Sequence, residues 1–250
     1  MNEKISIITT AFNSAKTIID TLKSVSGQSY QNIEHIIVDG SSIDGTIDII
    51  KKYERNNVKI ISEPDDGIYD ALNKGIRLAS GDIIGILHSD DLYADENVLS
   101  KIAESFSDSS IDGIYTDLIY VAQNDINKIF RYWKSRDFYP ELLKKGWMPP
   151  HPTVFLRKSI YEKFGLFDTS YKIAADYDFM LRIFSGGANL KYLPFVSYKM
   201  RTGGVSNRSI SHILCKSNED LKALRKYGVG GVYTLLCKNF SKFGQFLKKD

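Results

Sequence analysis

The sequence predicts an α/β protein whose largely parallel, Rossmann-like sheet is flanked by helices. From residue 4 to residue 87, short runs rich in β-branched residues alternate with segments whose apolar residues recur at helical spacing. Alternation of this kind is typical of strands joined by crossover helices. The length of 250 residues and the 43% share of hydrophobic residues suit one large domain with a buried core, with or without a small appendage.

Four strands and three helices are predicted in this first part. The strands occupy residues 5–10, 34–39, 58–61 and 83–87, and each ends near polar residues. Asn13 and Ser14 form a suitable N-cap pair for the first helix, and Asp44 can cap the second. The third helix is expected over residues 68–79 and should stop before Gly81.

The second half follows a different pattern. After residue 96 the sequence predicts, in order, a helix, a hairpin over residues 113–132, an irregular stretch over residues 146–152, a helix over residues 177–184 and a flexible loop over residues 198–206. Two further helices are expected from residue 209 onward, the second over residues 233–247. We therefore expect one domain over residues 1–206 and a helical extension over residues 207–250.

Composition and charge exclude several classes of function. The net charge of +3 is too small for a nucleic-acid-binding face. Cys215 and Cys237 have no neighbouring cysteine or histidine at metal-ligand spacing, so neither a disulfide framework nor a zinc site is expected. The N-terminus carries no apolar signal region and no apolar run reaches membrane-spanning length, so we expect a cytoplasmic protein.

Polar residues follow three of the predicted strands. Thr9 and Thr10 end the first, Asp39 ends the second, and a His-Ser-Asp-Asp turn at residues 88–91 follows the fourth. Ligands of open α/β sheets bind outside the carboxyl ends of the strands, which places these residues along one crevice. The two carboxylates suit Mg²⁺ or Mn²⁺, which take few protein carboxylates together with phosphate oxygens. Taken alone, the same pair equally fits a turn that caps the following helix.

In the order and spacing of its motifs, the chain resembles the family 2 glycosyltransferases, which have the GT-A fold and transfer sugars with inversion from nucleotide-sugar donors. The matching segments are residues 6–13, 38–46, 63–75, 81–91 and 174–178, so the resemblance covers roughly residues 1–205. It implies a nucleotide-diphosphate sugar as donor. The Glu-Pro-Asp-Asp-Gly-Ile-Tyr-Asp form of residues 63–70 is similar to bacterial enzymes that assemble exopolysaccharide, capsule or lipopolysaccharide.

The resemblance implies a set of donor contacts. The residues concerned are Thr9, Thr10, Asn13, Asp39, Asp66, Asn73 and Lys74. The first three would border the nucleotide, the fourth would accept a hydrogen bond from the base or the ribose, and the last three would lie near the ribose, the diphosphate or the donor sugar. Leu72 stands where many members have an arginine. Each of these residues has a simpler alternative as a helix cap, a turn residue or, for Lys74, part of a solvated helix face.

The same resemblance implies the metal site. The family's metal motif is usually Asp-x-Asp, and His88 occupies its first position. Asp90 would then be the principal ligand of Mn²⁺ or Mg²⁺, with Asp91 supporting the turn and Ser89 bordering the nucleotide. His88 is either a further ligand or, as we favour, a hydrogen-bonded histidine at the sheet edge. The metal would neutralise the departing diphosphate.

Asp176 matches the position of the family's catalytic base. An inverting transfer needs a carboxylate that removes the proton of the acceptor hydroxyl as its oxygen attacks the anomeric carbon. Ala175 stands where the family has a second acidic residue, so Asp178 is the alternative base. Asp176 can also act as the N-cap of the following helix, and the two roles are compatible.

Two more segments resemble parts of the family's site. Trp147 and His151 take the place of the acceptor-side wall, where aromatic faces stack on sugar rings. Buried packing is the alternative for Trp147. Arg201, in the predicted loop over residues 198–206, would close over the diphosphate and stabilise the leaving group, unless this is a plain surface loop.

The second helix of the extension is predicted to be amphipathic and basic. Its apolar residues are Phe240, Phe243, Phe246 and Leu247, and its basic residues are Lys238, Lys242, Lys248 and Lys249. Such a helix suits peripheral contact with an anionic membrane, and it also suits packing on the domain or self-association. Membrane contact would fit a polyprenyl-linked glycan as acceptor.

Two other functions are compatible with the same fold. A sugar nucleotidyltransferase would need a glycine-rich phosphate loop after the first strand, and residues 11–15 do not form one. A non-catalytic nucleotide-sugar-binding module is supported by the altered residues Leu72, His88 and Ala175. Turnover of a donor separates that module from an enzyme.

Overall fold

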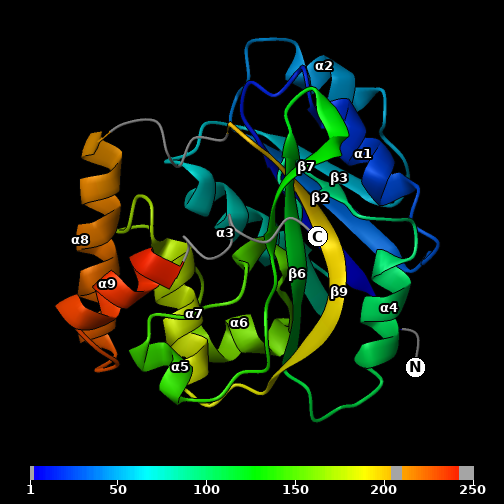
Figure 1. Cartoon of the computed structure of the whole chain (residues 1–250). Coiled ribbons are helices and arrows are strands. Elements are labelled where there is room, and N and C mark those ends of the chain that lie inside the picture. The colour runs from blue at the N-terminus through cyan, green and yellow to red at the C-terminus, as the bar shows by residue number, and fades with distance from the viewer. Residues whose placement is uncertain (1–2, 204–209, 242–250) are drawn as a thin grey trace.

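The computed structural model describes residues 3–203 and 210–241, in which a mixed sheet of nine strands has helices on both faces (Figure 1). The strands are β1 (Ile5–Ala11), β2 (Ile33–Asp39), β3 (Val58–Ser62), β4 (Ile83–Ile86), β5 (Leu92–Tyr93), β6 (Gly113–Ala122), β7 (Asp125–Trp133), β8 (Phe155–Arg157) and β9 (Leu190–Arg201). The helices are α1 (Ile18–Ser26), α2 (Thr46–Lys51), α3 (Ile68–Leu78), α4 (Val98–Ser105), α5 (Glu141–Lys144), η1 (His151–Thr153), α6 (Lys158–Phe164), α7 (Ala175–Ser185), α8 (Ile210–Lys226) and α9 (Val232–Ser241).

The first four strands confirm the predicted parallel half of the sheet. They lie in the order β3-β2-β1-β4, and each neighbouring pair is parallel. Ile8 and Ile36 face the side that α3 covers, whereas Ile7 packs on the other side, because successive side chains of a strand point to opposite faces. Both faces are apolar, as expected of strands covered by helices on each side.

Helix α3 lies close against β1 because Gly75 has no side chain. A Cβ at this position would be 2.5 Å from Cγ2 of Ile8, closer than packed carbon atoms approach. Helices α3, α6 and α7 cover one face of the sheet, and α1, α2 and α4 cover the other (Figure 1).

Helix α1 begins at Ile18 with Thr17 at its N-cap, so the prediction of an N-cap at Asn13 and Ser14 is wrong. Asn13 adopts a φ of 49° and turns its side chain toward the loop after β2 instead. Short polar side chains tolerate this left-handed conformation.

The second half of the sheet is mixed. Strand β8 pairs antiparallel with β4 and β6, β6 and β7 form the predicted hairpin, and β9 runs parallel to β6. Strand β9 continues to Arg201 and pairs with β5, where Leu92 lies opposite Lys199. The prediction of a loop is therefore wrong for residues 198–201, because their backbone pairs with residues 118–121 of β6 and, at Tyr198 and Lys199, also with β5. Residues 204–206 of that predicted loop lie outside the described residues.

Helices α8 and α9 confirm that the extension is helical. Helix α8 packs on α7, and Ala223 and Leu224 are buried in the core that lines α3 and α7 (Figure 1). Helix α9 is described to Ser241, so the remaining predicted helical residues, 242–247, lie outside the described residues. Within the described ranges, no helix has the length and apolar character needed to cross a bilayer.

Candidate active site

The polar residues expected along one crevice follow strand ends that are tied together. The amide of Gly40, just after β2, donates to the carbonyl oxygen of Ala11 at the end of β1 (2.9 Å). The amide of Leu87, just after β4, donates to the carbonyl oxygen of Ile8 on β1 (3.0 Å). The loops after β1, β2 and β4 therefore share one edge of the sheet, where ligands of such sheets bind.

Asn13 joins the loops after β1 and β2, and Asp39 joins the turn after β2 to the end of β3. The buried Asp39 carboxylate accepts hydrogen bonds from the Ser42 amide (3.1 Å) and the Ser62 hydroxyl (2.7 Å). The side-chain oxygen of Asn13 accepts from the amide of Ile43 (3.0 Å). Both residues therefore hold these loops in place, and Asp39 does so without any exposed surface.

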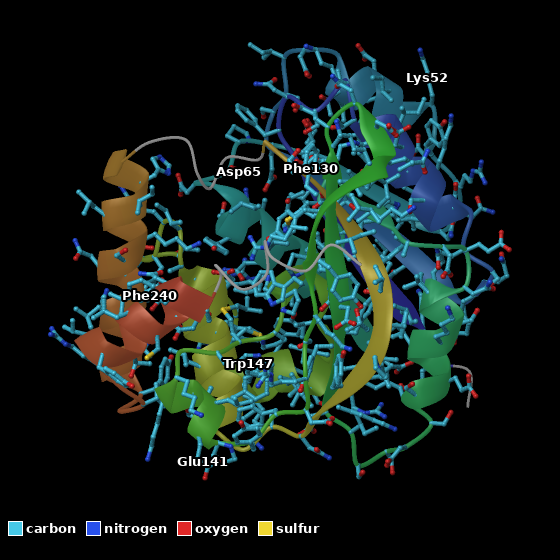
Figure 2. All side chains as sticks on the ribbon, in the orientation of Figure 1. Lys52, Asp65, Phe130, Glu141, Trp147 and Phe240 are labelled. Carbon is cyan, nitrogen blue, oxygen red and sulfur yellow. The ribbon has the colours of Figure 1, made fainter. Side chains whose placement is uncertain are left out.

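Phe12 and Asp65 lie beside this junction and were missed by the sequence reasoning. A Cβ on Gly40 would be 2.5 Å from Oδ2 of Asp65 and 3.3 Å from the Phe12 ring, so both side chains touch the turn after β2. The Phe12 ring is 66% exposed. Asp65 is marked at this edge in Figure 2, whereas Asp66 is exposed and its amide donates to Asp70 (3.3 Å). The available signal was Gly40, because a glycine after a strand often marks a close approach.

Thr9 and Thr10 point to opposite faces of β1, as neighbours on a strand must. Thr9 is fully buried, and its Oγ1 lies 2.8 Å from Nε2 of His35 on β2. Oγ1 of Thr10 lies 3.5 Å from Nδ1 of His88. Of the two threonines, Thr10 is therefore the one beside the turn after β4.

The two carboxylates of the turn after β4 have different surroundings. Asp90 is partly exposed, and within the described residues nothing donates to its carboxylate. Asp91 is buried and accepts from the amide of Arg201 (2.9 Å). Burial and, after it, the charge of Asp90 raise the pKa of Asp91. Asp90 is thus the accessible carboxylate of the pair, and Asp91 holds the turn.

His88 and Ser89 connect the turn to its neighbours. Burial lowers the pKa of His88, while the charges of Asp90 and Asp176 act in the opposite direction. The Ser89 hydroxyl lies 2.8 Å from that of Ser14 after β1. Asp90 and Asp176 therefore both lie within electrostatic reach of one imidazole, although they belong to different elements.

Arg201 lies behind this turn, at the end of β9. It is only 7% exposed, its Nη1 donates to the carbonyl oxygen of Asp90 (2.8 Å), and its Nη2 is ion-paired with Asp20 of α1 (2.6 Å). Both Nη atoms of this arginine therefore have partners within the protein. The arginine that we expected on a mobile loop is held in the strand that supports the turn.

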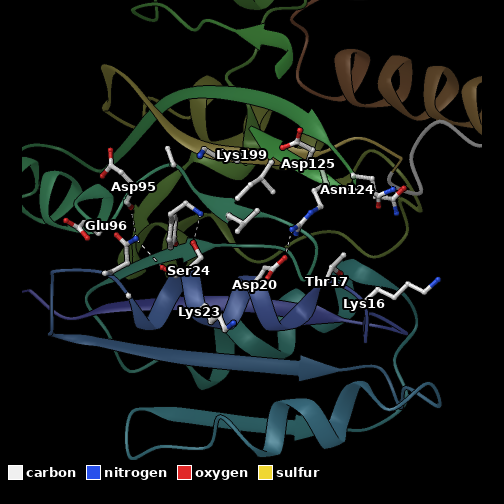
Figure 3. A pocket seen from close by; sticks show the side chains of 18 residues that line it. Lys16, Thr17, Asp20, Lys23, Ser24, Asp95, Glu96, Asn124, Asp125 and Lys199 are labelled. Carbon is white, nitrogen blue, oxygen red and sulfur yellow. Dashed lines mark hydrogen bonds and ion pairs between the residues drawn. The ribbon is translucent and has the colours of Figure 1, made fainter. Parts of the chain in front are cut away.

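The cavity in Figure 3, of about 830 Å³, also lies at this arginine. Its lining includes Asp20, Lys23 and Ser24 of α1, Asn124 and Asp125 of the β6–β7 turn, and Lys199 and Arg201 of β9. Asp39, Asp90 and Asp176 do not line it, so it is a different space from the crevice described above.

Asp176 lies in the first turn of α7 and is partly exposed. The single hydroxyl proton of Tyr69 is shared between the carbonyl oxygen of Ile173 (2.7 Å) and Oδ1 of Asp176 (3.2 Å). Burial and, after it, the charge of Asp176 raise the pKa of Tyr69, so the hydroxyl stays protonated. The N-cap of α7 is Ala174, so the expectation of Asp176 as N-cap is wrong by two residues.

Asp178 has no exposed surface. Its carboxylate accepts from Arg182 (2.8 Å) and Lys226 (2.9 Å) and from the hydroxyl of Tyr227 (3.2 Å). These contacts join α7 to α8, and no acceptor hydroxyl can reach the carboxylate without breaking them. Asp176 is the accessible carboxylate of the two.

The polar residues of α3 have structural partners. Asn73 is buried, and its side chain bonds both to the carbonyl oxygen (2.9 Å) and to the amide (3.0 Å) of Phe167. Lys74 donates to the carbonyl oxygen of Pro64 (2.8 Å) and pairs with Glu63 (2.9 Å) and Asp70 (3.3 Å). Lys74 holds the loop before α3, and Asn73 faces the core.

Trp147 and His151 follow α5 along the chain. Trp147, marked in Figure 2, is half-buried among the rings of Tyr115, Phe138 and Phe184. Burial lowers the pKa of His151 to about 4, although the charge of Asp176 opposes that shift. His151 is therefore neutral at pH 7 and lies within electrostatic reach of Asp176.

The described residues contain no group of three or more His, Cys, Asp or Glu side chains that could hold a metal ion. Asp90 offers one accessible carboxylate, and Mg²⁺ sites in proteins commonly combine one or two carboxylates with phosphate oxygens and water.

Comparison with known proteins identifies the family. The model of glycosyl transferase family 2 matches residues 6–166, which include the strand ends and the turn after β4. The chain belongs to glycosyl transferase family 2. This glycosyltransferase is 34% identical, over 180 residues, to an uncharacterized glycosyltransferase of Mycobacterium tuberculosis, covering 71% of this chain and 68% of the relative.

A second relative matches nearly the whole chain. The glycosyltransferase is 27% identical over 247 residues to WfaP of Escherichia coli, a UDP-Glc:α-D-GlcNAc-diphosphoundecaprenol β-1,3-glucosyltransferase. The match covers 94% of this chain and 91% of WfaP.

Solved structures share the fold of this family 2 glycosyltransferase. TarS of Staphylococcus aureus in complex with UDP-GlcNAc superposes with a TM-score of 0.70 and 20% identity, over 90% of this chain and 66% of that chain. The mannosyltransferase PcManGT of Pyrobaculum calidifontis in complex with GDP-Man and Mn²⁺ superposes with a TM-score of 0.68 and 19% identity, over 95% and 69%. The predicted GT-A fold is confirmed.

Proposed function

We propose that this family 2 glycosyltransferase moves a sugar, with inversion, from a nucleotide-diphosphate sugar to a hydroxyl of a glycan or a lipid-linked glycan in bacterial surface polysaccharide biosynthesis. The observation that carries the proposal is that two partly exposed carboxylates from different elements, Asp90 after β4 and Asp176 in the first turn of α7, both lie near His88. Asp90 follows a strand end, where the donor binds, and Asp176 starts a helix on another element.

The donor side of the crevice fits a nucleoside diphosphate. The exposed ring of Phe12 offers a stacking face to a base, and Asp39, which has no exposed surface, holds the turn after β2 beside that ring. Two proteins with this fold are described with UDP-GlcNAc and with GDP-Man. A nucleotide sugar of this kind is therefore the donor that we assign.

Asp90 is the residue that would hold Mn²⁺ or Mg²⁺. An accessible carboxylate without a partner among the described residues is a suitable oxygen ligand, because these cations need only one or two from the protein beside phosphate oxygens. PcManGT is described with Mn²⁺. When bound, the cation neutralises the charge of the departing diphosphate.

Asp176 acts as the general base. Its carboxylate takes the proton of the acceptor hydroxyl while the acceptor oxygen forms a bond to the anomeric carbon. The bond from that carbon to the diphosphate oxygen breaks, and its electron pair leaves with the nucleoside diphosphate. Attack opposite the leaving group inverts the configuration. The shared proton of Tyr69 orients the carboxylate for this step.

The acceptor binds on the side of Trp147 and His151. The half-buried indole offers a face to a sugar ring, and the neutral imidazole can hydrogen-bond to a hydroxyl near Asp176. WfaP is named for a diphosphoundecaprenol-linked GlcNAc acceptor, and it is similar over nearly the whole chain. We therefore assign a polyprenyl-linked glycan as the acceptor class.

The extension contributes a peripheral membrane contact. Large apolar side chains are exposed on its two helices; these are Ile213, Leu214, Val232, Tyr233, Leu236 and Phe240 (Figure 2 marks Phe240). An apolar face beside a lipid-linked acceptor would bury this surface in the membrane interface. Co-sedimentation with phosphatidylglycerol vesicles should fall in Tyr233→Ser/Leu236→Ser. Unchanged sedimentation, or dimers in light scattering that this variant abolishes, would contradict the membrane contact.

Donor turnover tests the main proposal. Release of UDP or GDP would be measured from UDP-glucose, UDP-GlcNAc and GDP-mannose with Mn²⁺, with and without an α-D-GlcNAc-diphosphate lipid. We expect turnover of one donor that EDTA abolishes. Asp90→Ala should lose Mn²⁺-dependent donor binding, whereas Asp125→Ala, on the exposed β6–β7 turn, should keep it. Donor binding without turnover of any donor would point to a non-catalytic module instead.

A further inference from the structure

Three charged residues of the helical extension gather around the start of α7, the helix that carries Asp176. They are Glu219 and Asp220 on α8 and Lys238 on α9. Figure 1 shows α8 and α9 beside α7, on the side away from β2 and β3. None of the three lies within residues 6–166, which the family model matches.

The carboxylate of Glu219 binds the backbone directly before α7. Its Oε1 accepts from the amide of Lys172 (2.9 Å), and its Oε2 accepts from the amides of Ile173 (2.9 Å) and Ala174 (2.8 Å). Hydrogen bonds to an ionised acceptor are the stronger kind, and three of them on consecutive amides fix the path of the chain. Asp176 follows two residues later.

The peptide held by Glu219 also controls the partner of Asp176. Ile173 binds Glu219 through its amide and accepts the hydroxyl proton of Tyr69 through its carbonyl oxygen (2.7 Å). The same proton is shared with Oδ1 of Asp176 (3.2 Å). A shift of this peptide would therefore change both the position of Asp176 and its hydrogen bond.

Lys238 and Asp220 support the next residue of α7. Nζ of Lys238 lies 2.7 Å from Oδ1 of Asp220 and 3.2 Å from the centroid of the Tyr177 ring, and both charged residues are buried. Burial lowers the pKa of Lys238 to about 8, against the charges of Asp220 and Asp176. A buried ion pair is stable only with closely matched geometry, so this contact sets how α7, α8 and α9 lie together.

From these contacts we infer that Glu219 is a positioning residue for Asp176 and that the helical extension forms part of the frame of the catalytic site. The inference rests on the proposed function, in which Asp176 is the general base. Glu219 touches no reacting atom and acts through residues 172–174. Because a displacement of about 1 Å can cost roughly a hundredfold in rate, the loss of this support should be visible in kcat.

The test compares Glu219→Gln and Glu219→Ala with Asn218→Ala, an exposed neighbour on α8. Gln keeps the size of the side chain but presents an NH₂ group to amides that need an acceptor. Hydrogen–deuterium exchange over residues 171–178 should become at least tenfold faster in both Glu219 variants, with exchange over residues 36–45 unchanged. Asn218→Ala should match the wild type.

Kinetics give the second measurement. With UDP-glucose, Mn²⁺ and the α-D-GlcNAc-diphosphate lipid, kcat per UDP-binding site should fall at least tenfold in the Glu219 variants, while the donor KM changes less than twofold. The concentration of UDP-binding sites is measured by calorimetry, so that a smaller fraction of folded protein in a variant does not lower its kcat. A kcat within twofold of wild type, or unchanged exchange over residues 171–178, would overturn the inference.

Asp176→Asn distinguishes this inference from the proposed function. If Asp176→Asn keeps full transfer, the base assignment fails and Glu219 has no base to position. If Asp176→Asn abolishes transfer and the Glu219 variants keep normal kcat, only the positioning role fails. A wild-type chain that turns over no nucleotide sugar contradicts the proposed function, and the exchange measurement still decides whether Glu219 holds residues 172–174.

Discussion

Arg201 donates a hydrogen bond through its guanidinium to the carbonyl oxygen of Asp90, at 2.8 Å. Through its backbone amide the same residue binds the carboxylate of Asp91 (2.9 Å), and its other guanidinium nitrogen pairs with Asp20 (2.6 Å). The side chain that carries the proposed metal ligand is thus accessible, while its backbone is held from behind by a buried arginine. A rigid support of this kind keeps a first ligand in its productive orientation.

Replacing Arg201 should weaken metal use rather than donor contact. In Arg201→Met the carbonyl oxygen of Asp90 loses its donor, so the turn relaxes and the Mn²⁺ concentration for half-maximal activity should rise about tenfold, within the range seen for residues that orient metal ligands. Lys199→Met, two residues earlier on β9, is the matched control and should leave this value unchanged. A rise in the donor KM with an unaltered Mn²⁺ requirement would instead favour a diphosphate contact for Arg201.

Asp176→Asn and Asp178→Asn should have different effects. Loss of the base should lower kcat by about 10²- to 10⁴-fold with little change in donor binding, because the amide cannot take the acceptor proton. Asp178→Asn leaves Arg182 and Lys226 with weaker partners, so it should lower the free energy of unfolding by about 3 kcal/mol or more. Its kcat per folded molecule should stay near wild type. Rates and urea unfolding measured on both variants check this, and the opposite pattern would exchange the two roles.

Acid should destabilise the protein between pH 6.5 and pH 4. Burial lowers the pKa values of His35 and His151 to about 4 each, whereas the ordinary value in an unfolded chain is 6.5. Between those pH values the unfolded chain binds protons that the folded protein does not. The contribution of the two histidines to the free energy of unfolding is therefore fully present above pH 6.5 and is lost as the pH decreases toward 4. Each histidine can account for about 3 kcal/mol of the free energy of unfolding by pH 4.

Urea unfolding as a function of pH measures this slope. His35→Gln and His151→Gln should each flatten the slope between pH 6.5 and 4, and the double variant should flatten it further. If the slope stays at the wild-type value in all three variants, these two histidines are not its source.

The buried pair of Lys238 and Asp220 should respond to single and double replacement in different ways. Lys238→Met leaves a buried carboxylate without its cation and should lower the free energy of unfolding by about 3 to 5 kcal/mol, whereas Lys238→Met/Asp220→Leu should recover most of that loss. Thermal and urea unfolding check both variants. A double variant as unstable as the single one would mean that packing around Tyr177, not the uncompensated charge, causes the loss.

Much of the fold could be predicted because its signals are local. The strands β1 to β4 are short runs of β-branched residues between polar turns, and crossover helices leave them no arrangement but parallel. Residues 198–201 carried no such signal. The glycines that follow them indicated a loop, and they form a strand because β6 pairs with all four residues and β5 with two of them.

The candidate site could be predicted as a set of positions but not as a set of contacts. The strand-end rule brought Asp39 and the turn after β4 to one edge, and the helix spacing put Asp176 at the start of α7. Phe12 and Asp65 escaped notice because their closeness to Gly40 depends on how two loops fold back on each other. Asn73 and Lys74 match the family's motif in the sequence, but their hydrogen-bond and ion-pair partners are known only from the packed structure.

By itself the sequence determined the family, the parallel half of the sheet and the order of the acidic motifs, because these depend on neighbouring residues along the chain. Only the tertiary structure decided which acid of each pair is accessible. Asp91 is bound by Arg201, 110 positions away, and Asp178 is bound by Lys226, 48 positions away. The segment before Asp176 is bound by Glu219, which is 45 positions from Ala174. A carboxylate is held or free according to its partners, and partners so distant are brought together only when the sheet and helices pack.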